Sequence, residues 1–130
     1  MKKLKVGIVG YEQYKKRTMA IARGEFKPAP DDPKIWFRSI ESFAKVLSDK
    51  NRELLALIAV TAPASMNELA EKTGRARSNL SRTLKTMERY GLVRFERGAG
   101  RTLAPRVHYS GIVLDMPLKR SSPSRRPVPA

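Results

Sequence analysis

The sequence predicts a mainly α-helical domain with a small antiparallel β-wing, preceded by an N-terminal strand–helix arm. Three neighbouring segments lead to this prediction: a short capped helix that starts at residue 65, a second helix over 77–90 that is rich in Arg, Asn and Ser, and an arginine-rich hairpin after it. Two helices joined by a short turn form a helix-turn-helix. With the hairpin added, the order of elements is that of a winged helix-turn-helix.

Length and charge fit one small basic domain. The chain has 130 residues, a formal net charge of +15 and a hydrophobic fraction of 41%, which is enough apolar sequence for a globular core. Lys and Arg outnumber acids in residues 1–30, 65–118 and 119–130, whereas residues 31–64 carry five of each. Such basic clusters are typical of nucleic-acid-binding proteins. The absence of cysteine excludes disulfides and thiol chemistry.

Residues 1–33 are expected to form the arm, which is a candidate for dimerisation. Residues 4–10 predict a strand that ends in Gly, and residues 11–23, which lack Gly and Pro, predict a helix. Residues 24–33 contain three prolines and predict a linker, because proline removes a backbone donor and restricts the residue before it. The pair Asp31-Asp32 in this linker is expected to be solvated.

Residues 34–118 are expected to form the winged helix-turn-helix domain, which begins with an aromatic anchor. Trp36 and Phe37 are expected to pin the arm onto the core. Ser39 is the expected N-cap of a helix whose apolar side chains recur on one face; these are Ile40, Phe43 and Leu47.

The next two helices are predicted from their caps and apolar residues. Ser48 caps a helix over 49–61 that is apolar on most sides, so this helix is expected at the buried centre of the domain. Pro63 ends it. Ser65 and Glu68 have the spacing of a capping box. They start a short helix that ends at the turn Thr73-Gly74.

The helix over 77–90 and the hairpin complete the domain. Gly91 is the expected C′ residue of this helix, and residues 92–97 alternate as a strand with Phe95 inward. Residues 98–100 form the tip, 107–109 lie on the returning strand, and 112–114 are expected to add a third strand. Residues 119–130 are rich in Pro, Ser and Arg and are expected to be a disordered basic tail.

The helix over 77–90 has the chemistry of a helix that enters the DNA major groove. With Leu80, Leu84 and Met87 inward, its other face carries Arg, Asn, Ser and Thr, and no acid occurs between Glu71 and Glu88. Arg pairs with guanine and Asn with adenine through two hydrogen bonds. The candidate DNA-binding residues on the turn and helix are Arg75, Arg77, Ser78, Asn79, Ser81, Arg82 and Lys85.

The hairpin weighs against the plainer interpretation, in which the helix is only amphipathic with a solvated polar face. Arginines surround its Gly-Ala-Gly tip, and Glu96 is the one acid there. A hairpin with no binding role would mix charges of both signs, whereas one that lies along a phosphate backbone would be basic. Its candidate DNA contacts are Arg94, Arg97, Arg101 and Arg106.

Residues 73–97, TGRARSNLSRTLKTMERYGLVRFER, resemble the helix-turn-helix of prokaryotic winged-helix regulators of the MarR and ArsR type. The matched positions are Thr73, Gly74, Ser78, Ser81, Arg82, Leu84, Met87, Gly91, Leu92 and Val93. Met87 replaces the usual Leu, and Ala76 stands where a Ser or Thr N-cap is usual. Over about residues 36 to 118 the chain is similar to a group of short predicted archaeal and bacterial regulators. The resemblance implies a small DNA-binding protein, commonly a dimer, and in some members an antitoxin.

These observations predict a dimeric, sequence-specific regulator that binds double-stranded DNA, in the role of a repressor. The alternative is a winged-helix adaptor or antitoxin that binds a partner protein, such as a cognate toxin, and binds DNA only weakly. RNA is disfavoured because no aromatic residue lies on the predicted reading face. No segment has the length of a membrane helix or of a signal-peptide core. A cytoplasmic, nucleoid-associated protein is expected.

No catalytic residue, metal site or cofactor is expected. His108 is the one histidine and is interpreted as structural. The pair Gly7 and Gly10 lacks the spacing of a dinucleotide-binding loop. The basic run 15–17 either touches DNA or, as we favour, is a solvated face of a dimerisation helix.

Overall fold

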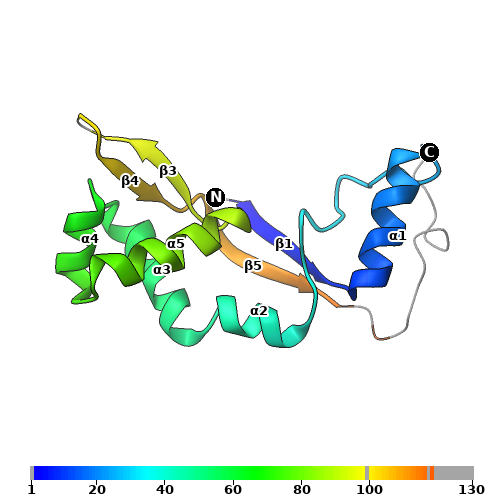
Figure 1. Ribbon diagram of the computed structural model, residues 1–130, viewed down its shortest axis with the longest axis horizontal. Coiled ribbons are helices and arrows are strands. Elements are labelled where there is room, and N and C mark those ends of the chain that lie inside the picture. The colour runs from blue at the N-terminus through cyan, green and yellow to red at the C-terminus, as the bar shows by residue number, and fades with distance from the viewer. Residues whose placement is uncertain (1, 99, 117, 119–130) are drawn as a thin grey trace. The chain divides into compact units, whose positions relative to one another are not determined.

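The computed structural model describes residues 2–98, 100–116 and 118 (Figure 1). Its elements are β1 (Lys2–Ile8), α1 (Tyr11–Ala22), β2 (Ile35–Phe37), α2 (Ile40–Val46), α3 (Asp49–Thr61), α4 (Met66–Thr73), α5 (Arg77–Arg89), β3 (Arg94–Arg97), β4 (Leu103–Arg106) and β5 (Tyr109–Asp115). The described strands form two sheets, one with the order β2-β1-β5 and one with β3 beside β4.

The fold is therefore mixed α/β, where the sequence predicts mainly α. The aromatic anchor at 35–38 is largely the strand β2, which pairs in parallel with β1. Residues 112–114, expected as a third strand of the hairpin, belong to β5 beside β1. The prediction failed here because the partner of β5 lies at the other end of the chain.

Contacts divide the chain into two compact units. Among the described residues, the first unit contains Lys2, 45–98 and 100–110, and hence α3, α4, α5, β3 and β4. The second contains 3–44, 111–116 and 118, and hence α1, β2 and most of β1 and β5. The division falls within α2. This grouping differs from the boundary after residue 33, which stays a prediction about domains.

In the first unit, one face of each helix supplies the core. Leu54 and Ile58 of α3 are buried, as are the inward residues of α4 and α5. The bounds predicted for α3 are confirmed, but the prediction that this helix is buried on most sides is wrong. Val60 is 84% exposed, so α3 buries one stripe like an ordinary surface helix.

The predicted N-caps are confirmed by hydrogen bonds, because capping depends on residues only a few positions apart. Ser48 Oγ accepts from the Asn51 N–H at 3.3 Å. Ser65 Oγ accepts from the Glu68 N–H at 3.1 Å. The Glu68 carboxylate accepts from the Ala64 N–H. Ser39 likewise accepts from the N–H three residues later, at 3.1 Å.

In the second unit, the β1–β2 pair has an apolar face and a polar face. Register pairs Val6 with Ile35 and Ile8 with Phe37, and the Phe37 ring packs edge-on against Phe43 at 5.3 Å. The opposite face carries Gly7 beside Trp36. A Cβ on Gly7 would lie 2.4 Å from the indole, so this position requires glycine for close packing rather than for a cofactor loop.

The segment 24–33 belongs to the second unit and is buried in part. The prediction that the pair Asp31-Asp32 is solvated is wrong for Asp32, whereas Asp31 is exposed. Asp32 is only 3% exposed. Its Oδ2 accepts from the Ala29 N–H at 2.8 Å and lies 3.5 Å from the Arg17 guanidinium. That guanidinium lies over the rings of Phe26 and Trp36, at 5.3 and 4.9 Å from their centres. A buried carboxylate requires such a partner, and the sequence shows no link between residues 17 and 32.

Candidate nucleic-acid interface

The helix α5 separates an apolar face from a polar one. Leu80, Leu84 and Met87 are fully buried, as predicted from their spacing. Two residues after the end of α5, Gly91 has a φ of 74°, and the Leu92 N–H donates to the Met87 carbonyl at 3.0 Å. This left-handed ending is one that glycine adopts without strain.

The outward face of α5 is polar and basic. Ser78, Asn79, Arg82 and Lys85 are exposed, and Ser81 is half-buried at the border of the two faces. Arg77 is exposed in the first turn. Ser78, Arg82 and Lys85 lie in a line along one side of α5. Within the described helix this side carries no acid, because Glu88 projects away from it.

Arg89 extends this line by another turn and was missed in the sequence analysis. It lies seven residues after Arg82 and is exposed, with Nη2 donating to the Thr86 hydroxyl at 3.4 Å. The spacing i, i+4, i+7, i+11 from Ser78 would have found it, because these positions fall on one side of an α-helix.

The N-terminus of α5 is open. Ala76 has extended backbone angles and provides no side-chain cap. The first N–H groups of a helix have no partner within the helix and carry its positive dipole end. Arg77, Ser78 and Asn79 therefore surround a position that favours an anion.

The turn between α4 and α5 fixes the start of α5. Gly74 has a φ of 71°, and its N–H donates to the Ala70 carbonyl at 2.9 Å. The Thr73 hydroxyl accepts from the Arg75 N–H at 3.2 Å. Arg75 is half-buried, and its guanidinium donates to the Lys50 carbonyl at 3.3 Å. This residue thus already ties the turn to α3.

The antiparallel pair β3–β4 forms a hairpin beside α3 and α4 (Figure 1). Its returning strand is Leu103–Arg106, earlier than the 107–109 predicted from the sequence. The Gly98 N–H donates to the Thr102 carbonyl at 2.8 Å and closes the turn. A Cβ on Gly98 would lie 2.6 Å from the Thr102 hydroxyl, so a compact closure needs glycine here.

The four hairpin arginines have different environments. Arg94, Arg97 and Arg101 are exposed, with Arg94 and Arg97 on opposite sides of the ribbon. Arg106 is half-buried, and its Nη1 donates to the carbonyls of Pro63 and Pro105 at 2.7 and 2.8 Å. Arg106 therefore holds the hairpin to the segment between α3 and α4.

Glu96 is the acid of the hairpin, and Arg106 and His108 of the same unit lie beside it. Its carboxylate lies 3.8 Å from Arg106 Nε and 3.7 Å from His108 Nε2. His108 is exposed. Within residues 2–98, 100–116 and 118, no group of three or more His, Asp or Glu is arranged to hold a metal ion.

A family model named HVO_A0114 matches residues 46–114, which is more than half of the chain. The chain belongs to the HVO_A0114 family. No curated protein and no solved structure matches it.

The HVO_A0114 match runs from the end of α2 to near the end of β5. All candidate DNA contacts lie inside it, whereas β1, α1 and β2 lie outside. The family name carries no activity or ligand, and the resemblance to MarR and ArsR regulators stays a prediction. No helix in the described part of the chain has the length and apolarity needed to cross a membrane.

Proposed function

We propose that this protein is a sequence-specific DNA-binding transcriptional regulator, acting as a dimeric repressor. α4 and α5 form the helix-turn-helix of a winged helix, α5 enters the major groove, and the β3–β4 hairpin is the wing. The observation that carries the proposal is the division of α5 into a fully buried apolar face and an outward basic face.

The outward side chains have the donors that base readout needs. Arg82 would form the bidentate pair with guanine and Asn79 the pair with adenine. The uncapped N-terminus of α5 would accept a backbone phosphate. Arg94, Arg97 and Arg101 would hold phosphates through the wing, and these contacts position the protein without reading sequence. Because Arg75 and Arg106 already bond within the protein, we assign them to support of the interface.

The first experiment is an anisotropy titration against the duplex upstream of the protein's own gene and a scrambled duplex, at two salt concentrations. Tighter binding to the upstream duplex that survives added salt supports a sequence-specific regulator. Equal and steeply salt-dependent binding to both would mean that the basic residues only grip phosphate. That result would favour the adaptor or antitoxin alternative.

Arg82→Ala tests the role of α5. Losing a bidentate base contact costs about 1–3 kcal/mol, so we expect affinity for the specific duplex to fall by a factor of about 5 to about 150, with a smaller effect on the scrambled duplex. Arg52→Ala is the matched control, since it removes the same charge from the exposed face of α3. Unchanged specific affinity for the Arg82 variant would refute the assignment.

Dimerisation predicts a near-palindromic operator. Two copies of α5 would contact half-sites about 34 Å apart, one helical turn of DNA. Footprinting would show two protected major-groove segments at this spacing, and sedimentation would give the mass of two chains.

A further inference from the structure

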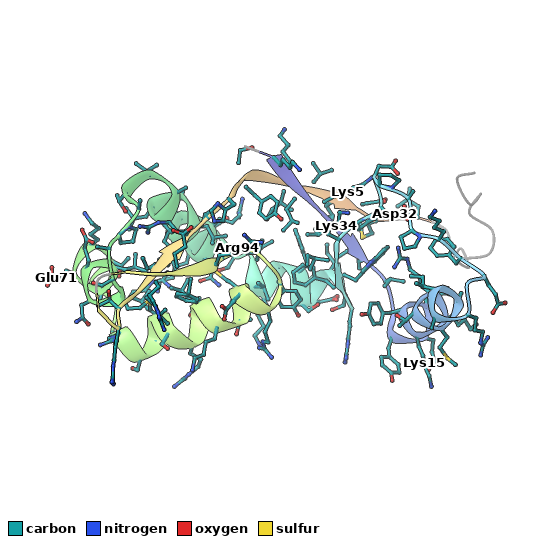
Figure 2. All side chains as sticks on the ribbon, turned by 90° about the horizontal axis from the view of Figure 1, so that it is seen from above. Lys5, Lys15, Asp32, Lys34, Glu71 and Arg94 are labelled. Carbon is teal, nitrogen blue, oxygen red and sulfur yellow. The ribbon has the colours of Figure 1, made fainter. Side chains whose placement is uncertain are left out.

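The β1–β2 pair carries lysines on its polar face. Alternation along β1 places Lys3 and Lys5 on the same side as Gly7. Register pairs Gly7 with Trp36. Lys34 directly precedes β2 and lies beside Lys5, because the Lys34 N–H donates to the Lys5 carbonyl. Figure 2 shows Lys5 and Lys34 close together. We call Lys3, Lys5 and Lys34 the lysine face.

Two like charges held close together repel each other. The Lys34 N–H donates to the Lys5 carbonyl at 3.1 Å, which holds the backbones of the two lysines side by side. Among the described residues, no carboxylate comes within ion-pair distance of Lys3, Lys5 or Lys34. Asp32, labelled near both lysines in Figure 2, is buried with its Oδ2 beside Arg17. An external anion would therefore offset the repulsion between Lys5 and Lys34.

The chemistry of this face selects a phosphate backbone rather than bases. Lysine binds phosphate as a point charge, and the lysine face has no guanidinium or amide group that would form a planar bidentate pair with a base edge. Of the residues in β1 and β2, Trp36 is the aromatic one on the side of Gly7, and its indole already packs against Gly7 and beneath Arg17. It therefore offers no open ring on which an unpaired base would stack.

We propose that the lysine face is a second DNA-binding surface, which contacts the phosphate backbone of double-stranded DNA without reading its sequence. The inference rests on the proposed DNA-binding function. It extends that function to the second unit, beyond α5 and the hairpin. Lys3 and Lys34 are exposed and Lys5 is half-buried, so the aliphatic stem of Lys5 rests on the sheet while its ammonium reaches the surface.

The test is the salt dependence of binding to the scrambled duplex, measured with the full chain. Each lost phosphate contact makes the slope of log affinity against log salt less steep by about 0.9. For the double variant Lys5→Gln/Lys34→Gln we expect a slope less steep by about 1.8. Lys27→Gln/Lys45→Gln removes the same charge from exposed positions elsewhere and should change the slope little. Lys5→Arg/Lys34→Arg should retain the salt slope of the unchanged protein.

The outcomes separate this inference from the proposed function. An unchanged slope for the Gln pair, or an equal change for the control pair, overturns the lysine face and leaves the α5 assignment intact. A protein that binds no duplex overturns both. The fluorescence of Trp36, the single tryptophan of the chain, reports whether each variant keeps the second unit folded. If Lys5→Gln/Lys34→Gln alters this fluorescence, the variant Lys5→Arg/Lys34→Arg decides the test. That variant keeps both charges, so a salt slope that becomes less steep in it as well would refute the proposal.

Discussion

At the scale of single residues, the tertiary environment decides what an arginine does. Arg97 and Arg106 both belong to the hairpin and look alike in the sequence. Arg97 is exposed, whereas the Arg106 side chain is 26% exposed and donates to two carbonyls. Hydrogen bonds from a charged donor contribute about 1.5–3 kcal/mol each. Arg106 therefore stabilises the fold, and Arg97 is left free for a ligand.

This contrast predicts opposite phenotypes for two alanine variants. Arg106→Ala should lower the free energy of unfolding by about 2 kcal/mol, because the Pro63 carbonyl loses its donor. Arg97→Ala should change stability by less than about 0.5 kcal/mol but make the salt slope of DNA binding less steep by about 0.9. Urea unfolding and anisotropy titrations measure the two effects. Equal stability of both variants would contradict the bracing role of Arg106.

At the scale of elements, local signals gave the helices and distant partners set the strands. Ser48, Ser65 and Gly91 mark helix ends within a few residues of sequence, so α3, α4 and α5 begin or end where predicted. The strands β2 and β5 pair with β1 across much of the chain. A strand's partner depends on which surfaces meet in space, and residue patterns within one strand do not contain that information.

The open N-terminus of α5 gives a prediction at this scale. Ala76→Ser should raise the free energy of unfolding by about 1 kcal/mol, because a hydroxyl would cap an N–H group that now lacks a side-chain acceptor. Ala76→Asp should stabilise the fold as well, but its carboxylate would repel a phosphate at the same place. Thermal melts and DNA titrations separate the two effects. Undiminished DNA affinity in the Asp variant would show that no phosphate lies at this helix end.

At the scale of the whole molecule, much of the positive charge lies outside α5 in the sequence. The formal net charge is +15, and a field of this sign attracts DNA before specific contacts form. The sequence places four of these charges, with no acid, in residues 119–130, which lie outside the described residues. We expect this tail to add affinity that does not depend on sequence.

Removal of residues 119–130 should therefore weaken binding to specific and scrambled duplexes by the same factor. The salt slope should become less steep by up to about 3.6, from four phosphate contacts at about 0.9 each. A full-length variant in which the four Lys and Arg of the tail are changed to Gln distinguishes the effect of tail charge on DNA affinity from the effect of tail length. If truncation lowers only the specific affinity, the tail reads sequence and this prediction is wrong.

The sequence by itself determined the helices, their caps and the inward and outward faces of α5, because these follow from spacing within a few turns. It also indicated most of the exposed basic residues that we propose as DNA contacts. Only the tertiary structure decided that Asp32 is buried beside Arg17, that Arg106 braces the hairpin, and that Lys5 lies beside Lys34. Each of these depends on segments that are distant in the chain, and their proximity arises only when the sheets and loops pack.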